Sequence, residues 1–288
     1  MTAPAQAFPE LSPAQQERLA YRRGQGRRSR LLAGTSTVVF LVVMGAVVVL
    51  SPGWERVKEQ FLDPQVAKES FPAILDGFWL NLRVLAVSAV LIVLVGLGLA
   101  AMRTLRGPVF APLRVLAAVY TDVFRGFPLI VLLYIIGFGV PGLRLQGVPT
   151  SPVVLGGLAL VLTYSAYVSE VFRAGIETVH PSQRMAARSL GLTYGQSMRR
   201  VVLPQAVRRV TPPLLNDFVA LQKDVGLISV LGAVDAVRAA QIEVARTYDF
   251  TPYLVAGLLF ILLAVPTVRL ADWVNLRAAR RQQAGGVL

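Results

Sequence analysis

Ionisable side chains lie inside long apolar segments of the chain. Asp122 and Arg125 are three residues apart in the apolar segment 112–136, so on a helix they share one face. Lys223 and Asp224 fall well inside a second apolar segment. Charges at such depth are costly, and they usually line a path for a polar solute or pair with one another. Asp122 and Arg125 therefore either bind a solute or form an internal salt bridge, and the sequence leaves both open.

A zwitterionic solute would match this set of charges. In a low-dielectric cavity its carboxylate needs a cation, which Arg125 or Lys223 provides, and its ammonium needs an anion, which Asp122 or Asp224 provides. Hydroxyl groups lie in the apolar segment between, at Tyr164, Ser165, Tyr167 and Ser169. Such hydroxyls either line a cavity or form hydrogen bonds between helices.

The sequence lacks the residue sets that catalysis and cofactor binding require. There is no cysteine, and the single histidine, His180, leaves no pair for a metal cluster and is expected in a solvated turn. No Gly-x-x-x-x-Gly-Lys-Ser/Thr loop occurs, so the chain is not expected to bind ATP in that way. Neither a His-Glu-x-x-His motif nor a serine nucleophile elbow is found. We therefore predict neither an enzyme nor a cofactor of its own.

Apolar segments of membrane-spanning length must position these charges. The chain has 288 residues, of which 55% are hydrophobic, with a mean hydropathy of +0.59, which is too apolar for a soluble domain. Each apolar segment is long enough to cross a hydrocarbon core of about 30 Å as a helix. We predict an all-α polytopic membrane protein with six transmembrane helices, at residues 31–50, 78–102, 112–136, 152–172, 207–231 and 253–272.

The segments outside the spans complete the predicted organisation. Residues 1–30 are expected to be a disordered basic tail, and 31–50 an uncleaved N-terminal anchor because no small-x-small cleavage site follows it. Residues 51–73 form a linker of mixed charge, and 277–288 a second basic tail.

Positive charge orients these segments. The net charge of +13 comes from arginines beside the spans, which argues against a nucleic-acid-binding domain. Both tails, the link 103–106 and the loop 173–206 are rich in arginine, whereas the alternate loops are balanced or slightly acidic. The positive-inside rule then places both termini in the cytoplasm and the linker 51–73 outside.

The basic loop 173–206 is predicted to form two short helices. Pro181 suits a first helical turn, and Gly191 can take the left-handed conformation that ends the helix. A second helix is expected from Tyr194 to Val202, after which Leu203-Pro204 turns the chain back into the membrane. Ala186 and Ala187 carry little side chain and would let a partner's groove approach the helix, although a basic interfacial hairpin without a partner fits the same pattern.

Several motifs resemble the permease subunits of ATP-binding-cassette importers for polar amino acids. The similarity covers residues 74–276, a five-helix transmembrane domain to which 31–50 adds one helix. The residues that carry it are Glu170-Val-Phe-Arg-Ala-Gly175, Gln183-x-x-Ala-Ala-x-x-x-Gly191, Leu203-Pro204-Gln205, Asn216, Lys223-Asp224 and Arg125-Gly126-Phe127-Pro128-Leu129.

The resemblance implies partners and site residues. The partners would be two ATPase subunits that bind ATP, a second permease subunit (identical or paralogous), an external solute-binding protein and a polar amino acid, at a bacterial inner membrane. The residues expected to dock on the ATPase are Gln183, Met185, Ala186, Ala187, Leu190, Gly191, Leu203 and Pro204. The residues expected along the substrate path are Asp122, Arg125, Asn216, Lys223 and Asp224.

Two positions depart from the family pattern. Met185 stands where the signature has glutamate, which puts a charge-based contact there in doubt. Val225-Gly226 stand where Thr-Ser usually follows Lys-Asp. An alternative function is a stand-alone, ion-coupled secondary transporter, which would predict an internal repeat that the sequence does not display convincingly.

Overall fold

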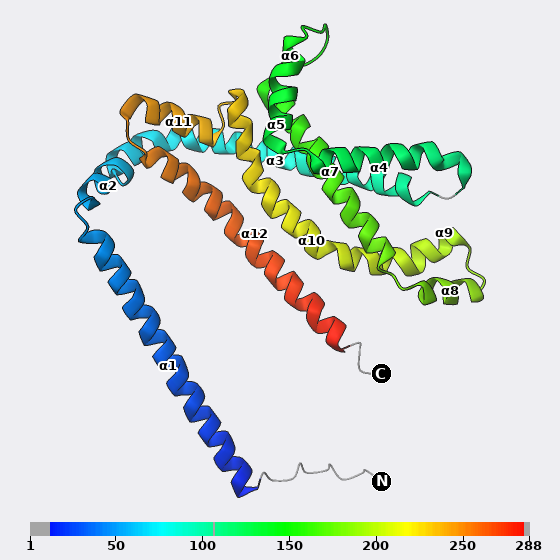
Figure 1. Ribbon diagram of the computed structural model, residues 1–288, viewed down its shortest axis with the longest axis horizontal. Helices are drawn as coiled ribbons and strands as arrows, with labels where there is room; N and C mark the ends of the chain where they lie inside the picture. The colour runs from blue at the N-terminus through cyan, green and yellow to red at the C-terminus, as the bar shows by residue number, and fades with distance from the viewer. Residues whose placement is uncertain (1–11, 106, 285–288) are drawn as a thin grey trace. The chain divides into compact units, whose positions relative to one another are not determined.

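The computed structural model describes residues 12–105 and 107–284 (Figure 1). Within these residues every regular element is a helix and no β-strand occurs. The chain forms two compact units, one ending at Glu59 and one beginning at Gln60. The helices are α1 (Pro13–Val49), α2 (Trp54–Phe61), α3 (Pro64–Thr104), η1 (Pro108–Phe110), α4 (Ala111–Gly126), α5 (Leu129–Tyr134), η2 (Ile135–Gly139), α6 (Val140–Gly142), α7 (Pro152–Glu177), α8 (Pro181–Ser189), α9 (Tyr194–Ser197), η3 (Met198–Val202), α10 (Leu203–Asp224), η4 (Val225–Leu231), α11 (Ala236–Thr247) and α12 (Thr251–Ala284).

Helix α1 contains the predicted first span and extends beyond it. Its stretch Leu32–Val49 is long and apolar enough to cross a membrane, and every side chain in it is exposed within this chain. The expected disorder of residues 1–30 is wrong from Pro13 onward, because those residues continue the helix; residues 1–11 lie outside the described part. Alanine, glutamine, glutamate, leucine and arginine dominate there, and all are good helix formers that extend an existing helix at low cost.

The predicted linker 51–73 and residues 277–284 of the predicted tail are also largely helical. Asp63 caps α3, since its carboxylate accepts hydrogen bonds from the backbone N–H groups of Gln65 and Val66, and Pro64 fills the first helical position. Helix α12 runs to Ala284, so the described part of the expected tail continues the last span as a helix.

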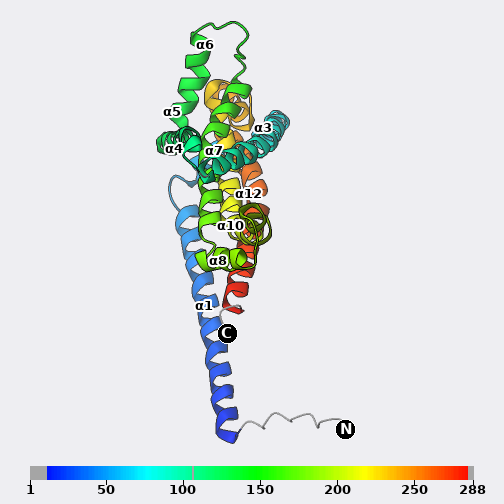
Figure 2. The same cartoon turned by 90° about the vertical axis from the view of Figure 1, so that its right-hand side faces the viewer.

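The core of the second unit lies where α3, α7, α10 and η4 meet (Figures 1 and 2). Buried side chains there include Val84, Ile92, Leu160 and Ile228. Helices α3 and α7 pack closely because Gly96 has no side chain: a Cβ there would lie 2.8 Å from a methyl group of Val168.

The predicted span 112–136 is broken rather than straight. Helices η1–α4 and α5–α6 meet at an angle of 104°. Pro128 lacks the N–H that a continuous helix needs, and it disfavours the helical conformation of the residue before it, so Phe127 is extended, with φ −86° and ψ 127°. A second break of 51° separates η4 from α11 in the region of the predicted span 207–231.

The number of straight spans is therefore smaller than predicted. In the part of the chain that the structure describes, four helices are long and apolar enough to cross a membrane, and the number rises to six if each bent pair counts as one span. Helix α10 also contains Pro212 and Pro213, which remove the helical hydrogen bonds to the carbonyls of Arg208 and Arg209.

Helix α11 is held against α3 by a buried polar contact. Asn81 donates to the carboxylate of Asp235 at 2.9 Å and accepts from the backbone N–H of Ala236 at 3.0 Å. The backbones approach so closely that a Cβ on Gly77 would lie 2.4 Å from the carbonyl carbon of Asp235. Because Asp235 also caps α11 by accepting from the N–H of Arg238 at 2.9 Å, these contacts fix where α11 begins.

Candidate functional site

The predicted hairpin in the loop 173–206 is present as α8 and α9. Figure 1 shows it at the end of α7 and α10 that lies away from α11. Helix α8 begins at its cap, His180, whose ring nitrogen accepts from the N–H of Ser182 at 3.2 Å. It ends in a Schellman motif, in which Leu192 donates to the carbonyl of Ala187 at 3.1 Å and Gly191 to that of Arg188 at 2.9 Å. Gly191 has a φ of +78°, which confirms the predicted left-handed residue.

The exposed side chains of α8 differ from the predicted docking surface at one position. Gln183, Met185 and Ala186 are exposed, and so is Leu190, with 82% of its surface accessible. Ala187 is only 3% exposed, so the expectation that it would meet a partner is wrong. It lies on the inner side of α8, which packs against η3, and its small size permits that packing instead.

Leu203-Pro204 does not turn the chain, contrary to our expectation. Helix α9 passes through the π-helix η3 directly into α10. A wider π turn accommodates a proline that cannot donate to the preceding turn. Leu203 and Pro204 are both exposed near the hairpin.

Polar contacts attach the hairpin to the two long helices behind it. Arg184 of α8 and Arg209 of α10 donate to the carbonyls of Ile176 and Thr178 at the C-terminal end of α7. Cationic side chains are stabilising at the C-terminal end of a helix, because the last carbonyls there accept no hydrogen bond from an N–H of the same helix. Gln205 of α10 also donates to Gln183 of α8 at 3.4 Å. The hairpin is thereby linked to both α7 and α10.

A second feature, which we call the polar pocket, lies where α4 breaks from α5 and faces α7 and α10. It has a volume of about 370 Å³. Its lining residues are Arg125, Gly126, Phe127, Pro128, Leu129, Thr163, Tyr164, Tyr167, Asp217, Ala220 and Asp224.

The polar pocket brings together some of the predicted path residues but not all. Arg125 and Asp224 line it, from α4 and α10 respectively. Asp122, Asn216 and Lys223 are exposed on the chain and do not line it. The predicted hydroxyl groups take both of the expected roles. Tyr164 and Tyr167 line the pocket. Ser165 and Ser169 of α7 instead form hydrogen bonds to α4, with Tyr120 at 2.8 Å and Thr121 at 3.3 Å respectively.

The carboxylates of the polar pocket differ in their partners. Asp224 accepts a hydrogen bond of 2.7 Å from the hydroxyl of Tyr164. Asp217 was absent from the predicted path although it lines the pocket; it stands seven residues before Asp224, two turns along the same face of α10. That spacing was the signal that could have identified it.

Arg125 pairs with Glu170 rather than with Asp122. The described residues contain no ion pair between Asp122 and Arg125, so that hypothesis is wrong. Arg125 Nη1 lies 4.0 Å from Glu170 Oε2, and its guanidinium carbon is 5.7 Å from the ring centre of Tyr167. Glu170 is the hub of a charged cluster, since it also binds Arg173 and accepts from Arg103 at 2.7 Å. This cluster joins α3, α4 and α7.

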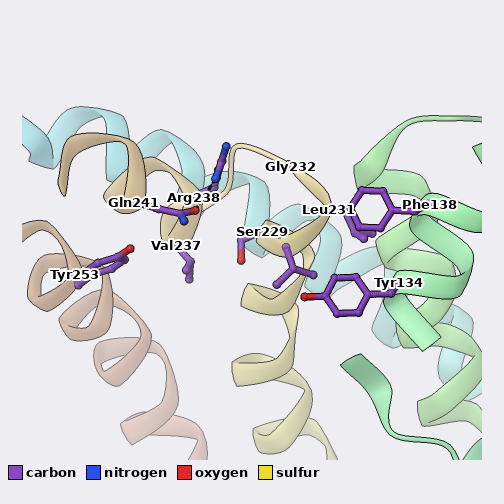
Figure 3. Close-up of a pocket in the computed structure, with 10 residues that line it drawn as sticks. Tyr134, Phe138, Ser229, Leu231, Gly232, Val237, Arg238, Gln241 and Tyr253 are labelled. Carbon is purple, nitrogen blue, oxygen red and sulfur yellow. Dashed lines mark hydrogen bonds between the residues drawn. The ribbon is translucent and has the colours of Figure 1, made fainter. Parts of the chain in front are cut away.

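A larger cavity of about 540 Å³ lies elsewhere in the second unit, and we call it the aromatic pocket (Figure 3). Tyr134 and Phe138 approach it from α5 and η2, while Arg238 and Gln241 approach it from α11. Leu231 lies between them, against Gly137, where an added Cβ would be 2.3 Å from a methyl group of Leu231. None of the predicted site residues lines this pocket.

The described residues contain no group of three or more histidine, aspartate or glutamate side chains arranged to hold a metal ion. The polar pocket offers recognition by charge and hydrogen bonds, because one guanidinium, two carboxylates and two phenols line it.

Comparisons with known proteins agree on one kind of relative. Residues 93–280 match the family described as "Binding-protein-dependent transport system inner membrane component". The chain is 35% identical over 205 residues to the "Arginine transport system permease protein ArtQ" of Bacillus subtilis (strain 168), which covers 71% of this chain and 91% of that protein. It is 34% identical over 201 residues to the "Probable glutamine ABC transporter permease protein GlnM" of the same organism, which covers 69% and 89%.

A solved structure has the same fold. The "Crystal structure of an amino acid ABC transporter with histidines" contains a chain that is 32% identical to this one, with a TM-score of 0.68. The match covers 75% of this chain and 99% of that chain.

Proposed function

From the premise that this chain belongs to the family of binding-protein-dependent transport system inner membrane components, we propose that its cargo is polar amino acids and that the polar pocket is their path. The chain is the transmembrane permease subunit of an ATP-binding-cassette importer, a multi-pass membrane protein. That membership replaces the stand-alone ion-coupled carrier that the sequence had left open.

The observation that carries this proposal is the pairing of opposite charges inside an apolar helical unit. Arg125 meets the carboxylate of the amino acid, and Asp224 meets its ammonium group. Tyr164 and Tyr167 hold these two partners in place, because Tyr164 donates to Asp224 and Tyr167 donates to the carbonyl of Arg125 at 3.2 Å. A zwitterion that leaves water recovers a partner for each charge there. Relatives that carry the names of arginine and glutamine transporters support this class of cargo.

The hairpin of α8 and α9 docks on an ATPase subunit in this proposal. Its contact surface consists of Met185, Ala186 and Leu190, with Gln183, Leu203 and Pro204 beside them. Gly191 sets the angle between the two helices. ATP is bound and hydrolysed by the ATPase, so this chain needs no cofactor of its own. Two ATPase subunits, a second permease subunit and an external solute-binding protein complete the importer.

Both termini of the chain lie in the cytoplasm of a bacterial cell in this proposal, and the hairpin lies on the same side. Reporter fusions test it. Fusions after Arg106, Gln196 and Gln283 should read as internal, and fusions after Gly53, Gly142 and Ala240 as external. An internal signal after Gly53 would remove the first span from the arrangement.

Uptake and assembly measured together test the path. Arg125→Gln should abolish uptake of amino acids while the ATPase still co-purifies with the permease. Adding Asp122→Asn should restore nothing, because the two residues do not pair. Loss of the ATPase from purified Arg125→Gln complexes would instead make Arg125 a structural residue and refute its place on the path.

A further inference from the structure

A third cavity, which we call the apolar groove, lies between the hairpin and three long helices. It has a volume of about 380 Å³. Residues that line it come from the last turns of α3 and α7, from α9 and η3 of the hairpin, and from the first half of α10. The groove shares no lining residue with the polar pocket or the aromatic pocket.

The apolar groove has a buried floor and an accessible opening. Ala100, Ala206 and Val210 line it and are at most 4% exposed. Leu97 of α3 and Val207 of α10 also line it, and they are 46% and 58% exposed. A ligand can therefore enter from outside the chain and contact apolar side chains on both helices.

Hydrocarbon suits this groove better than water. Among its described lining residues, only Thr104 and Tyr194 carry a hydroxyl group, and that of Thr104 already donates to the carbonyl of Ala101 at 2.9 Å. A buried water needs at least about two polar partners, so a groove with this lining holds water poorly. Apolar atoms that face an empty groove also lose dispersion contacts, which a hydrocarbon chain would restore.

The groove lies where hydrocarbon chains of a bilayer can reach it. Helices α3 and α7 are both candidate membrane spans, and they end at Thr104 and Glu177. Leu97 to Leu105 and Phe172 to Ile176 line the groove within those last turns. The groove is thus at the membrane boundary on the side of the hairpin, which is the cytoplasmic side in the proposed orientation.

Two guanidinium groups lie beside the lining residues. Arg114 of α4 donates to the carbonyl of Leu105, a lining residue, at 3.2 Å and to that of Gly107 at 2.8 Å. Arg199 is exposed and directly follows the lining residue Met198 in η3. Within the described part of the chain neither arginine has an acidic partner, since Glu170 pairs with Arg103, Arg125 and Arg173 instead.

We infer that the apolar groove binds an anionic phospholipid, with one acyl chain in the groove and the phosphate on Arg114 and Arg199. Guanidinium groups bind phosphate through charge-assisted hydrogen bonds, and basic pockets between spans attract anionic headgroups. A headgroup with its own ammonium would bring a third positive charge to the two arginines, so a net negative headgroup is preferred. Because Tyr194 and Met198 line the groove, the acyl chain also packs against the hairpin.

Lipid binding to the purified permease–ATPase complex in detergent micelles, measured by native mass spectrometry, tests this site. The probes are phosphatidylglycerol and phosphatidylcholine with the same acyl chains. The wild-type complex should bind phosphatidylglycerol at least about tenfold more tightly, because each arginine near an anionic headgroup contributes about fivefold. Arg114→Gln and Arg199→Gln should each weaken phosphatidylglycerol about fivefold and leave phosphatidylcholine nearly unchanged.

A second variant tests the acyl chain. Ala101 is exposed and lines the groove, so Ala101→Phe places a ring in the groove and should weaken both lipids about fivefold or more. Ala86→Phe makes the same change at an exposed position of α3 outside the groove and should weaken neither. Glycerol phosphate, which carries the headgroup without acyl chains, should not displace the bound lipid.

Arg277→Gln is the control for general attraction between arginines and anionic lipids. Arg277 is exposed near the C-terminal end of α12, which does not line the groove. A loss of phosphatidylglycerol binding in Arg277→Gln as large as in Arg199→Gln would refute the site. Equal wild-type affinities for the two lipids, or unchanged binding in Ala101→Phe, would also refute it. None of these outcomes affects the importer function, because uptake and co-purification of the ATPase are measured separately.

Discussion

The end of helix α8 offers a graded test of how the hairpin meets its ATPase. Gly191 has a φ of +78°, and an ideal Cβ built on it meets no atom within 4 Å. A side chain there therefore costs backbone strain alone, without any clash. For an ordinary residue this strain is about 1–2 kcal/mol. If the ATPase binds only the observed shape of the hairpin, Gly191→Ala should weaken its binding by about five- to thirty-fold.

Different side chains at position 191 should weaken ATPase binding to different degrees. Gly191→Asn should be the mildest change, because asparagine tolerates the left-handed conformation. Gly191→Ala should be intermediate, and Gly191→Val the most severe, because a β-branched side chain is poorly accommodated there. The assay is the affinity of purified ATPase for nanodisc-embedded permease, together with substrate-stimulated ATP hydrolysis.

Gly195→Ala provides the matched control. Gly195 lies within α9, and its added Cβ also meets nothing within 4 Å, but its φ is not positive. Alanine is favoured over glycine in a helix, so this change should preserve binding. If Gly191→Val bound ATPase as tightly as Gly195→Ala, the left-handed end of α8 would play no part in docking, and the reasoning would fail.

Three further changes test other contacts. Met185→Glu introduces the family's residue at a side chain that is 61% exposed, so it should retain or tighten ATPase binding in the same assay. Glu170→Gln should lower the thermal unfolding temperature of the permease, because it leaves Arg103 and Arg173 without their shared carboxylate. Glu177→Gln removes a more exposed ion pair and should lower the free energy of unfolding by less than about 1 kcal/mol. Gly77→Ala should also lower the thermal unfolding temperature, because its Cβ would meet the backbone of Asp235 at 2.4 Å. Gly98→Ala is the control and should not lower it, because nothing lies within 4 Å of its added Cβ. Equal unfolding temperatures for the two variants would contradict the close packing of α3 and α11.

Local sequence signals predicted the helical elements and the two ends of α8 well. Pro181 and Gly191 act through their own backbone geometry, so their roles can be read without a tertiary structure. Residues 13–30 were misassigned because their polar composition resembles a disordered tail, although most of them favour a helix.

The candidate site was harder to predict because it depends on packing. Arg125 has Asp122 one turn away on its own helix, but its observed partner, Glu170, comes from α7. Ala187 and Ala186 are adjacent in sequence, yet only the packing of α8 against η3 decides which of them is buried. The break at Phe127-Pro128 was visible as a proline, but its angle of 104°, which opens the polar pocket, follows from the surrounding helices.

Helices α7 and α10 connect the hairpin to the polar pocket, and they differ in stiffness. Helix α7 has no proline after Pro152 and carries Tyr164, whereas α10 has Pro212 and Pro213 between the hairpin and Asp224. About 30 Å of α10 separates Leu203 from Asp224, so a tilt of about 5° at the hairpin would move a rigid α10 by about 3 Å at the pocket. Because α10 lacks two helical hydrogen bonds, it is the more flexible of the two helices. Helix α7 has an unbroken hydrogen-bond ladder over the same length and would transmit the tilt without bending. The 2.7 Å hydrogen bond between Tyr164 of α7 and Asp224 of α10 joins the two helices at the pocket, so a bend in α10 would act directly on it.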